Sequence, residues 1–133
     1  VLGADEMKKL IVTNNPMVRE KYSQQYDLKY EETSFVGVLK QVRDLVHRGY
    51  RLLTHPLSGS IKPNETSYKS VLLEESTGKI DEFSVRVIEE AVLTCDKFSQ
   101  KKYPYKKDVT RDFQFVDLTL FESGLESDTI SRR

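Results

Sequence analysis

The sequence predicts a small three-layer α/β domain, in which helices flank a mostly parallel sheet of four to five strands. Short apolar runs typical of buried strands alternate along the chain with segments whose apolar residues recur every three to four positions, as in helices. The 133 residues are enough for one compact core and few for two, so one domain is expected.

The first predicted strand is the apolar run at residues 10–12, which ends at turn-forming residues. Asn15 followed by Pro16 favours a helix start, because an Asn side chain accepts a hydrogen bond from a free N–H and Pro fits the first helical position. A helix over residues 16–26 is therefore expected, and residues 28–32 form a weaker second strand.

Two longer helices have clearer patterns. Apolar side chains form one stripe over residues 35–46, with Ser34 as a cap and Gly49 as a stop. A second stripe predicts a helix over residues 81–98, with Asp81 as its cap.

Three further strands complete the prediction. Two of them, at residues 51–54 and 70–73, lie on either side of a long polar loop. The last is expected at residues 113–121, where the apolar alternation slips near Val116 and suggests a bulge or an edge position. Strands joined by helices are expected to be parallel, whereas the pair around the long loop is left open as a hairpin.

Charge and composition exclude several function classes. The 21 acidic and 21 basic side chains cancel, so nothing attracts the whole chain to nucleic acid or to an anionic membrane. No run of 18 apolar residues is present to span a bilayer. The basic and aromatic stretch Lys101–Lys107 is expected to be a solvated loop rather than a nucleic-acid contact.

The single cysteine, Cys95, excludes an internal disulfide and a cysteine-rich metal site, and it lies on the apolar stripe of its helix. We expect it to be buried and unreactive, in a cytoplasmic protein. Residues 1–6, which precede Met7, are interpreted as an N-terminal extension or a cloning scar. Residues 7–121 form the predicted domain, and residues 122–133 a polar tail.

The most polar loops follow the first and third predicted strands. In open α/β sheets, ligands bind beyond the carboxyl ends of the strands. Amides, hydroxyls, a glycine backbone and one lysine suit a small ligand that carries a phosphate or a carboxylate. The candidate ligand-binding residues are Asn14, Asn15, His55, Ser58, Gly59, Ser60, Lys62 and Asn64. The alternative is a capped helix and a turn-rich connector with no ligand.

His55 is the candidate catalytic residue, because an imidazole transfers protons near neutral pH. The alternative is a histidine that only bonds the loop backbone. His47 falls outside the apolar stripe of its helix and is expected to be solvated. With two histidines and no paired carboxylate spacing, neither a metal site nor a cofactor is predicted.

The segments Met7–Pro16 and Arg51–Thr66 resemble the GrdX family, small proteins encoded beside glycine reductase components in amino-acid-fermenting anaerobes. The similarity extends from Met7 to about Phe98. The resemblance implies a cytoplasmic accessory protein of glycine, sarcosine or betaine reduction. It supplies neither an activity nor catalytic residues.

Two function classes remain. The preferred one is an accessory or binding protein of the glycine reductase system, which holds a small anionic metabolite or a reductase component at residues 14–16 and 54–66. The other is a small enzyme that uses His55 as a general acid or base on a phosphate- or carboxylate-bearing substrate, with the surrounding amides, hydroxyls and lysine orienting it. Replacing His55 separates them, since only the enzyme would lose turnover.

Overall fold

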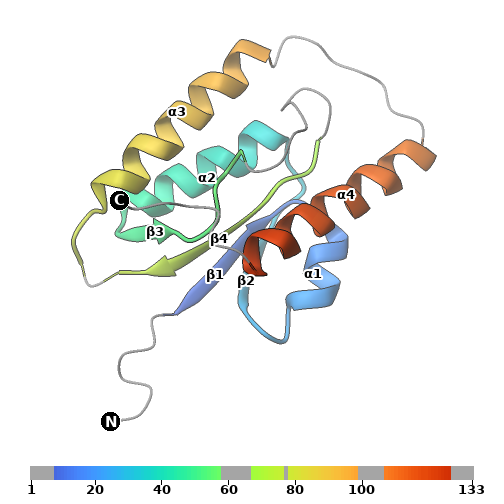
Figure 1. Cartoon of the computed structure of the whole chain (residues 1–133), viewed down its shortest axis with the longest axis horizontal. Coiled ribbons are helices and arrows are strands. Elements are labelled where there is room, and N and C mark those ends of the chain that lie inside the picture. The colour runs from blue at the N-terminus through green and yellow to red at the C-terminus, as the bar shows by residue number, and fades with distance from the viewer. Residues whose placement is uncertain (1–7, 58–66, 77, 99–106, 127–133) are drawn as a thin grey trace.

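The computed structural model describes residues 8–57, 67–76, 78–98 and 107–126. Four strands and four helices follow one another along these residues (Figure 1). Their order is β1 (Lys9–Thr13), α1 (Pro16–Tyr22), β2 (Asp27–Tyr30), α2 (Phe35–His47), β3 (Tyr50–Leu52), β4 (Ser70–Glu75), α3 (Glu82–Phe98) and α4 (Lys107–Glu126).

The sheet is mixed, which corrects the expectation of a mostly parallel one. Its order is β2-β1-β4-β3, with β1 and β2 parallel and β4 antiparallel to both β1 and β3. Strands β1, β2 and β3 therefore run in one direction, as expected for strands joined by helices. The reversal comes from β4, which follows the long polar loop and pairs with β3 as the hairpin alternative allowed.

Residues 113–121 are helical, so the predicted last strand is wrong. Within α4, Asp117 and Phe121 are buried, whereas Phe115 is 62% exposed. Buried positions four residues apart are the pattern of a helix. The break in apolar alternation near Val116 reflects the helical repeat, and the bulge that was expected there is wrong. The helix continues to Glu126, beyond the predicted start of the tail.

Capping side chains and turns set the ends of the other helices. The Ser34 side chain accepts a hydrogen bond from the Gly37 N–H and caps α2, as expected. After α2, Gly49 has a φ of 109°, which favours glycine and turns the chain into β3. Helix α1 ends at Tyr22, four residues earlier than expected, because the chain turns there to enter β2.

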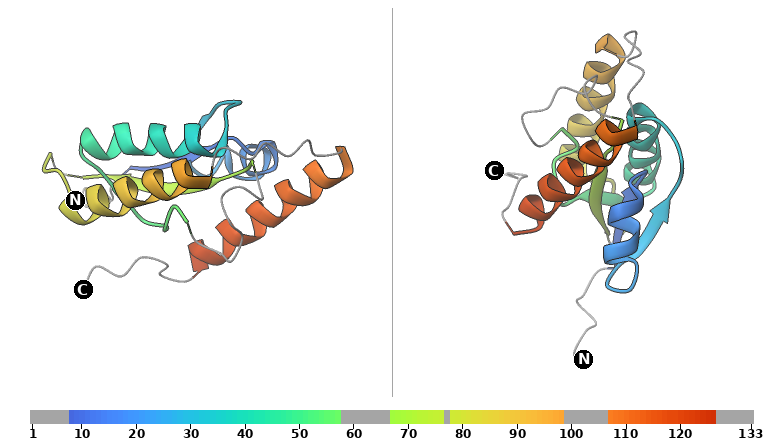
Figure 2. Two further views of the ribbon diagram at one scale, coloured as in Figure 1. Left: turned by 90° about the horizontal axis from the view of Figure 1, so that it is seen from above. Right: turned by 90° about the vertical axis from the view of Figure 1, so that its right-hand side faces the viewer.

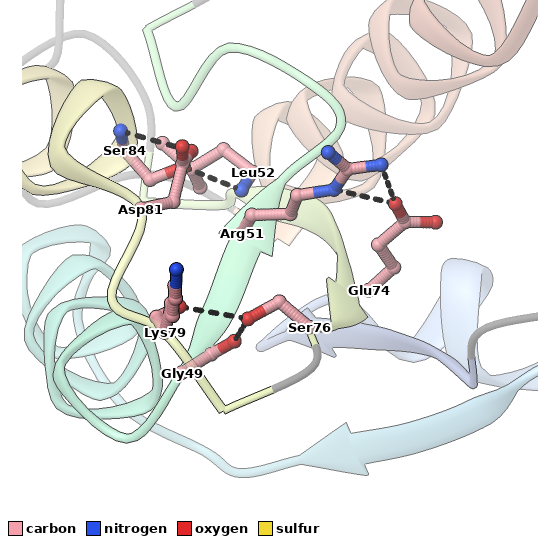
Figure 3. A network of polar contacts seen from close by, with 8 residues as sticks. All are labelled: Gly49, Arg51, Leu52, Glu74, Ser76, Lys79, Asp81 and Ser84. Atoms are coloured by element: carbon pink, nitrogen blue, oxygen red, sulfur yellow. Dashed lines mark hydrogen bonds and ion pairs between the residues drawn. The ribbon is translucent and has the colours of Figure 1, made fainter.

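Helix α3 is attached to β3 through its first turn. The Ser84 hydroxyl accepts a hydrogen bond from the Leu52 N–H at 2.9 Å and donates one to the Asp81 carboxylate at 2.5 Å. Asp81 also accepts from the Ser84 N–H, as the predicted cap should (Figure 3). On the same sheet edge, Arg51 of β3 pairs with Glu74 of β4, the residue directly opposite it. The Ser84 contacts join α3 to the outer strand β3, and the ion pair joins β3 to β4.

The apolar core lies on both faces of the sheet. Val12, Val71 and Leu73 pack with the buried stripes of α2 and α3, which lie side by side in Figures 1 and 2. Ile11 and Leu72, which alternate with these residues, pack instead with α1 and α4. Both faces of the two central strands are therefore buried. Within the described residues, no helix is both long and apolar enough to cross a membrane.

Replacing Ile88 with Ala should lower the free energy of unfolding by about 2–5 kcal/mol, because this fully buried side chain fills the interface between α3 and the sheet. Urea denaturation followed by circular dichroism measures the change. Leu93→Ala on the same helix is the matched control, since Leu93 is 62% exposed and should change stability by about 0.5 kcal/mol or less. Equal losses in the two variants would contradict the packing of α3.

Candidate functional site

The candidate site is the sheet edge at which β1, β2 and β3 end and β4 begins. Thr13 at the end of β1 pairs with Ser70 at the start of β4. Thr54, just after β3, accepts a hydrogen bond from the Leu72 N–H through its hydroxyl. Both polar loops of the predicted site therefore leave the sheet at this edge. We refer to it below as the polar edge.

Asn14 is buried at the polar edge and joins three segments of the chain. Its Nδ2 donates to the carbonyl oxygens of Thr33 and Ser67, both at 2.7 Å. Its Oδ1 accepts a hydrogen bond from the Lys69 N–H at 2.9 Å. The amide therefore ties the end of β1 to the β2–α2 connection and to the residues that lead into β4. Its hydrogen-bonding groups are engaged within the protein rather than directed at a ligand.

Asn15 is completely buried and caps α1, as predicted, by accepting a hydrogen bond from the Met17 N–H at 3.0 Å. Its Nδ2 has a second role that the sequence did not reveal. It donates to the carbonyl oxygen of Gln114 at 2.8 Å and to the Asp117 carboxylate at 2.9 Å. One side chain therefore starts α1 and holds α4 against the sheet.

Asp117 is the centre of this buried network. Its Oδ2 accepts a hydrogen bond from the Ser70 hydroxyl at 2.8 Å as well as from Asn15. The Ser70 hydroxyl lies 2.6 Å from that of Thr13, which in turn accepts from the Asn15 N–H. Sequence reasoning missed Asp117 because it was placed in a strand. A lone carboxylate inside an apolar run was the available signal.

Lys69 brings a positive charge to the same region and is 5% exposed. Burial lowers the pKa of its ammonium group, while the negative charge of Asp117 opposes that shift. Burial likewise raises the pKa of Asp117, and its hydrogen bond from Asn15 and the charge of Lys69 oppose this. Each charge therefore reduces the cost of burying the other.

His55 is half-buried on the β3 side of the polar edge. Burial lowers its pKa, and the charge of Lys69 lowers it further, while Glu90 acts in the opposite direction. Its Nδ1 accepts a hydrogen bond from the Leu57 N–H at 3.0 Å. In the neutral imidazole the proton then resides on Nε2, so this ring nitrogen is a donor and not a base. The backbone-bonding alternative thus accounts for one side of the ring.

The remaining predicted ligand-binding residues lie outside the described part of the chain. They are Ser58, Gly59, Ser60, Lys62 and Asn64. Lys101–Lys106 fall outside it too, and Lys107 begins α4. Within the described ranges, no group of three or more His, Cys, Asp or Glu side chains could hold a metal ion.

The predictions for Cys95 and His47 can be compared with the structure directly. Cys95 is buried, as expected, and burial raises the pKa of its thiol to about 11. The thiol is therefore protonated at neutral pH and a poor nucleophile. His47 is exposed, as expected, with its Nε2 3.3 Å from Glu89.

A surface cleft of about 430 Å³ opens on the β2 side of the polar edge. It lies where the start of α1, the β2–α2 connection, the residues before β4 and the first half of α4 meet. Its lining residues are Asn14, Pro16, Tyr30, Glu32, Thr33, Ser67, Tyr68 and Gln114. The Gln114 side chain donates a hydrogen bond to the Tyr68 hydroxyl at 3.0 Å, which joins α4 to the segment before β4.

Comparison with known protein families gives a match over most of the chain. The family model described as GrdX-like protein matches residues 10–126. The chain belongs to the GrdX-like family. The match confirms the resemblance seen in the two loop segments and extends it through α4, so this helix is part of the GrdX-like unit. No curated protein and no solved structure matches the chain.

Asp117→Asn should destabilise the GrdX-like fold by about 2 kcal/mol, because the buried charge of Lys69 loses its neighbouring negative charge and the hydrogen bonds from Asn15 and Ser70 weaken. Urea denaturation at pH 7 measures the change. Asp112→Asn on the exposed face of α4 is the matched control and should have little effect. If both variants were as stable as the wild type, the network would not be what holds α4.

Acid should destabilise the protein partly through His55. Because the pKa of His55 is lower in the folded chain than in the unfolded one, the unfolded chain binds the proton more readily. This contribution to stability is present above the ordinary histidine pKa of about 6.5 and is lost as the pH falls through the folded value. His55→Asn keeps an acceptor for the Leu57 N–H without titrating. The loss of stability between pH 7.5 and 5 should therefore be smaller in the variant, and an equal loss would contradict the assignment.

Proposed function

We propose that the chain is an accessory protein of glycine reductase-related systems, which binds a small anionic ligand or a reductase component at the polar edge. The observation that carries the proposal is the family match over residues 10–126. The proposed binding loops are residues 14–16 and 54–66, the two loops that leave the sheet at this edge.

The charges on the β3 side of the polar edge support an anionic ligand. Lys69 and His55 are close enough for the charge of one to lower the pKa of the other. A bound phosphate or carboxylate would offset this repulsion, and it would favour the protonated form of His55. The residues proposed to complete the site are Ser58, Gly59, Ser60, Lys62 and Asn64, which follow in the same loop.

Binding has more support than proton transfer. A general base needs a free lone pair within reach of the substrate. In the neutral form of His55, the Nδ1 lone pair accepts the Leu57 N–H and Nε2 carries the proton. The second candidate is an enzyme in which the protonated imidazolium form of His55 donates its Nε2 proton and becomes a neutral imidazole. Its distinguishing property is turnover that is lost when His55 alone is replaced.

The anion proposal is tested with inorganic phosphate and acetate at constant ionic strength, with chloride as the reference salt. Binding should raise the melting temperature, and a ligand at a hundredfold excess over its Kd should add about 2.7 kcal/mol to stability. In an NMR titration, the bound anion should raise the pKa of His55. The resonance of His47, at the far end of α2, should not respond to the anion and serves as the control.

Lys62→Gln should weaken the anion effect without lowering the stability of the free protein, since it removes a charge and leaves the hydrogen bonds of Asn14 and Asn15 intact. Binding of a reductase component is tested separately. The wild-type protein is mixed with purified glycine reductase components, and complex formation is followed by size-exclusion chromatography. The proposal fails if neither anion shifts the melting temperature and no reductase component forms a complex.

A further inference from the structure

The cleft on the β2 side of the polar edge shares Asn14 and Pro16 with the first proposed binding loop, but it lies apart from His55. His55 follows β3 and Tyr30 ends β2, and these are the two outer strands of the sheet. Strands β1 and β4 lie between them, each about 4.8 Å from its neighbour. A small molecule in the cleft would therefore not reach His55, so its chemistry has to be read from its own lining.

The described residues that line the cleft include two aromatic rings and one formal charge. Tyr30 and Tyr68 contribute two rings, both half-buried, and Glu32 is the one charged side chain among the described residues that line it. The hydrogen bond from Gln114 holds the Tyr68 hydroxyl in place at 3.0 Å. The Asn14 amide, which could otherwise donate to an anion, is engaged by protein carbonyl oxygens. This combination disfavours an anion.

Tyr30 already engages a cation. The guanidinium carbon of Arg19 lies 4.2 Å from the centre of the Tyr30 ring, within the range of a cation–π interaction. The face of an aromatic ring is negative, so it attracts a positive charge, and a nearby carboxylate adds to the attraction. Arg19 is therefore both a precedent for a cation at this ring and a competitor for it.

We propose that this cleft binds the ammonium group of a small organic cation. Glu32 supplies the opposite charge, while Tyr30 and Tyr68 supply the ring surfaces that contact the ammonium group and its apolar stem. The ammonium group belongs either to a free amine or to a lysine side chain of a partner protein.

The test titrates the full chain with n-butylammonium and follows the tyrosine ring and glutamine side-chain resonances by NMR. n-Butanol has the same stem without the charge, and butyrate carries the opposite charge. We expect n-butylammonium to shift the resonances of Tyr30, Tyr68 and Gln114, and the other two probes to bind more weakly or not at all. If n-butanol or butyrate bound as tightly as the amine, the proposal would be overturned.

Variants of the residues that line the cleft test whether n-butylammonium binds there. Glu32→Gln should weaken n-butylammonium binding about two- to fivefold, the usual contribution of one exposed cation contact. Tyr68→Leu should weaken it to a similar extent, whereas Tyr68→Phe keeps the ring and should retain binding. Arg19→Gln should strengthen binding, because it removes the competing cation from Tyr30. Unchanged affinity in both Glu32→Gln and Tyr68→Leu would disprove the assignment.

Two controls complete the experiment. Urea denaturation of each variant shows whether a loss of binding comes from unfolding, and Tyr68→Phe and Arg19→Gln give outcomes that unfolding cannot imitate, namely retained and strengthened binding. A third probe distinguishes the two sources of the ammonium group, because Nα-acetyl-lysine methylamide presents it on a lysine side chain. Tighter binding of this compound than of n-butylammonium supports a partner's lysine as the source, and tighter binding of n-butylammonium supports a free amine. The phosphate titration is followed at His55 and the amine titration at Tyr30, Tyr68 and Gln114, on the other side of the sheet, so either proposal can fail alone.

Discussion

The buried amide of Asn15 and the carboxylate of Asp117 form the contact on which much of the remaining structure depends. A buried polar group that loses its partner costs about 1–3 kcal/mol, so each of these side chains favours the burial of the other. The contact joins residues 102 positions apart and brings the start of α1, the middle of α4 and, through Ser70, the start of β4 to one point. On the face of the sheet that α1 and α4 cover, this polar contact and a small apolar cluster around Phe121 hold α4 in place.

Asn14 performs a similar task one residue earlier. Its amide bonds the backbone of Thr33 in the β2–α2 connection and of Ser67 and Lys69 before β4, so it joins these two segments to the end of β1. The polar edge is therefore held together at its centre by the two asparagines. The two proposed binding regions lie on either side of this centre. His55 follows β3 on one side, and the aromatic cleft lies beside β2 on the other. A rigid centre keeps the two sides at a fixed separation.

Much of the fold could be predicted from local pattern, because the two best helices have one apolar face each. The stripes of α2 and α3, the caps Ser34 and Asp81 and the burial of Cys95 all depend on residues close together in sequence. The direction of β4 could not be predicted, since alternation is the same in parallel and antiparallel strands. Helix α4 was mistaken for a strand because a few apolar residues in a short window fit both periods.

The two polar loops leave the sheet at one edge, as expected, but the hydrogen bonds of Asn14 and Asn15 depend on distant partners. Asn14 and Asn15 read as loop donors in the sequence because Ser67, Gln114 and Asp117, which engage their amides, are 53 to 102 positions away. The aromatic cleft was missed for the same reason. Tyr30, Tyr68 and Gln114 come from three separate elements, and no spacing in the sequence connects them.

The position of α4 at the end of the described chain has a consequence for synthesis. A chain that emerges from the ribosome presents β1, β4, α2 and α3 first, and these elements complete the first core. Until α4 emerges, Ile11 and Leu72 on the opposite face lack the cover of Phe121, and Ser70 lacks its carboxylate partner. The nascent protein therefore passes through a stage with one finished face and one open, apolar face. The open face makes this intermediate prone to aggregation and a target for chaperones.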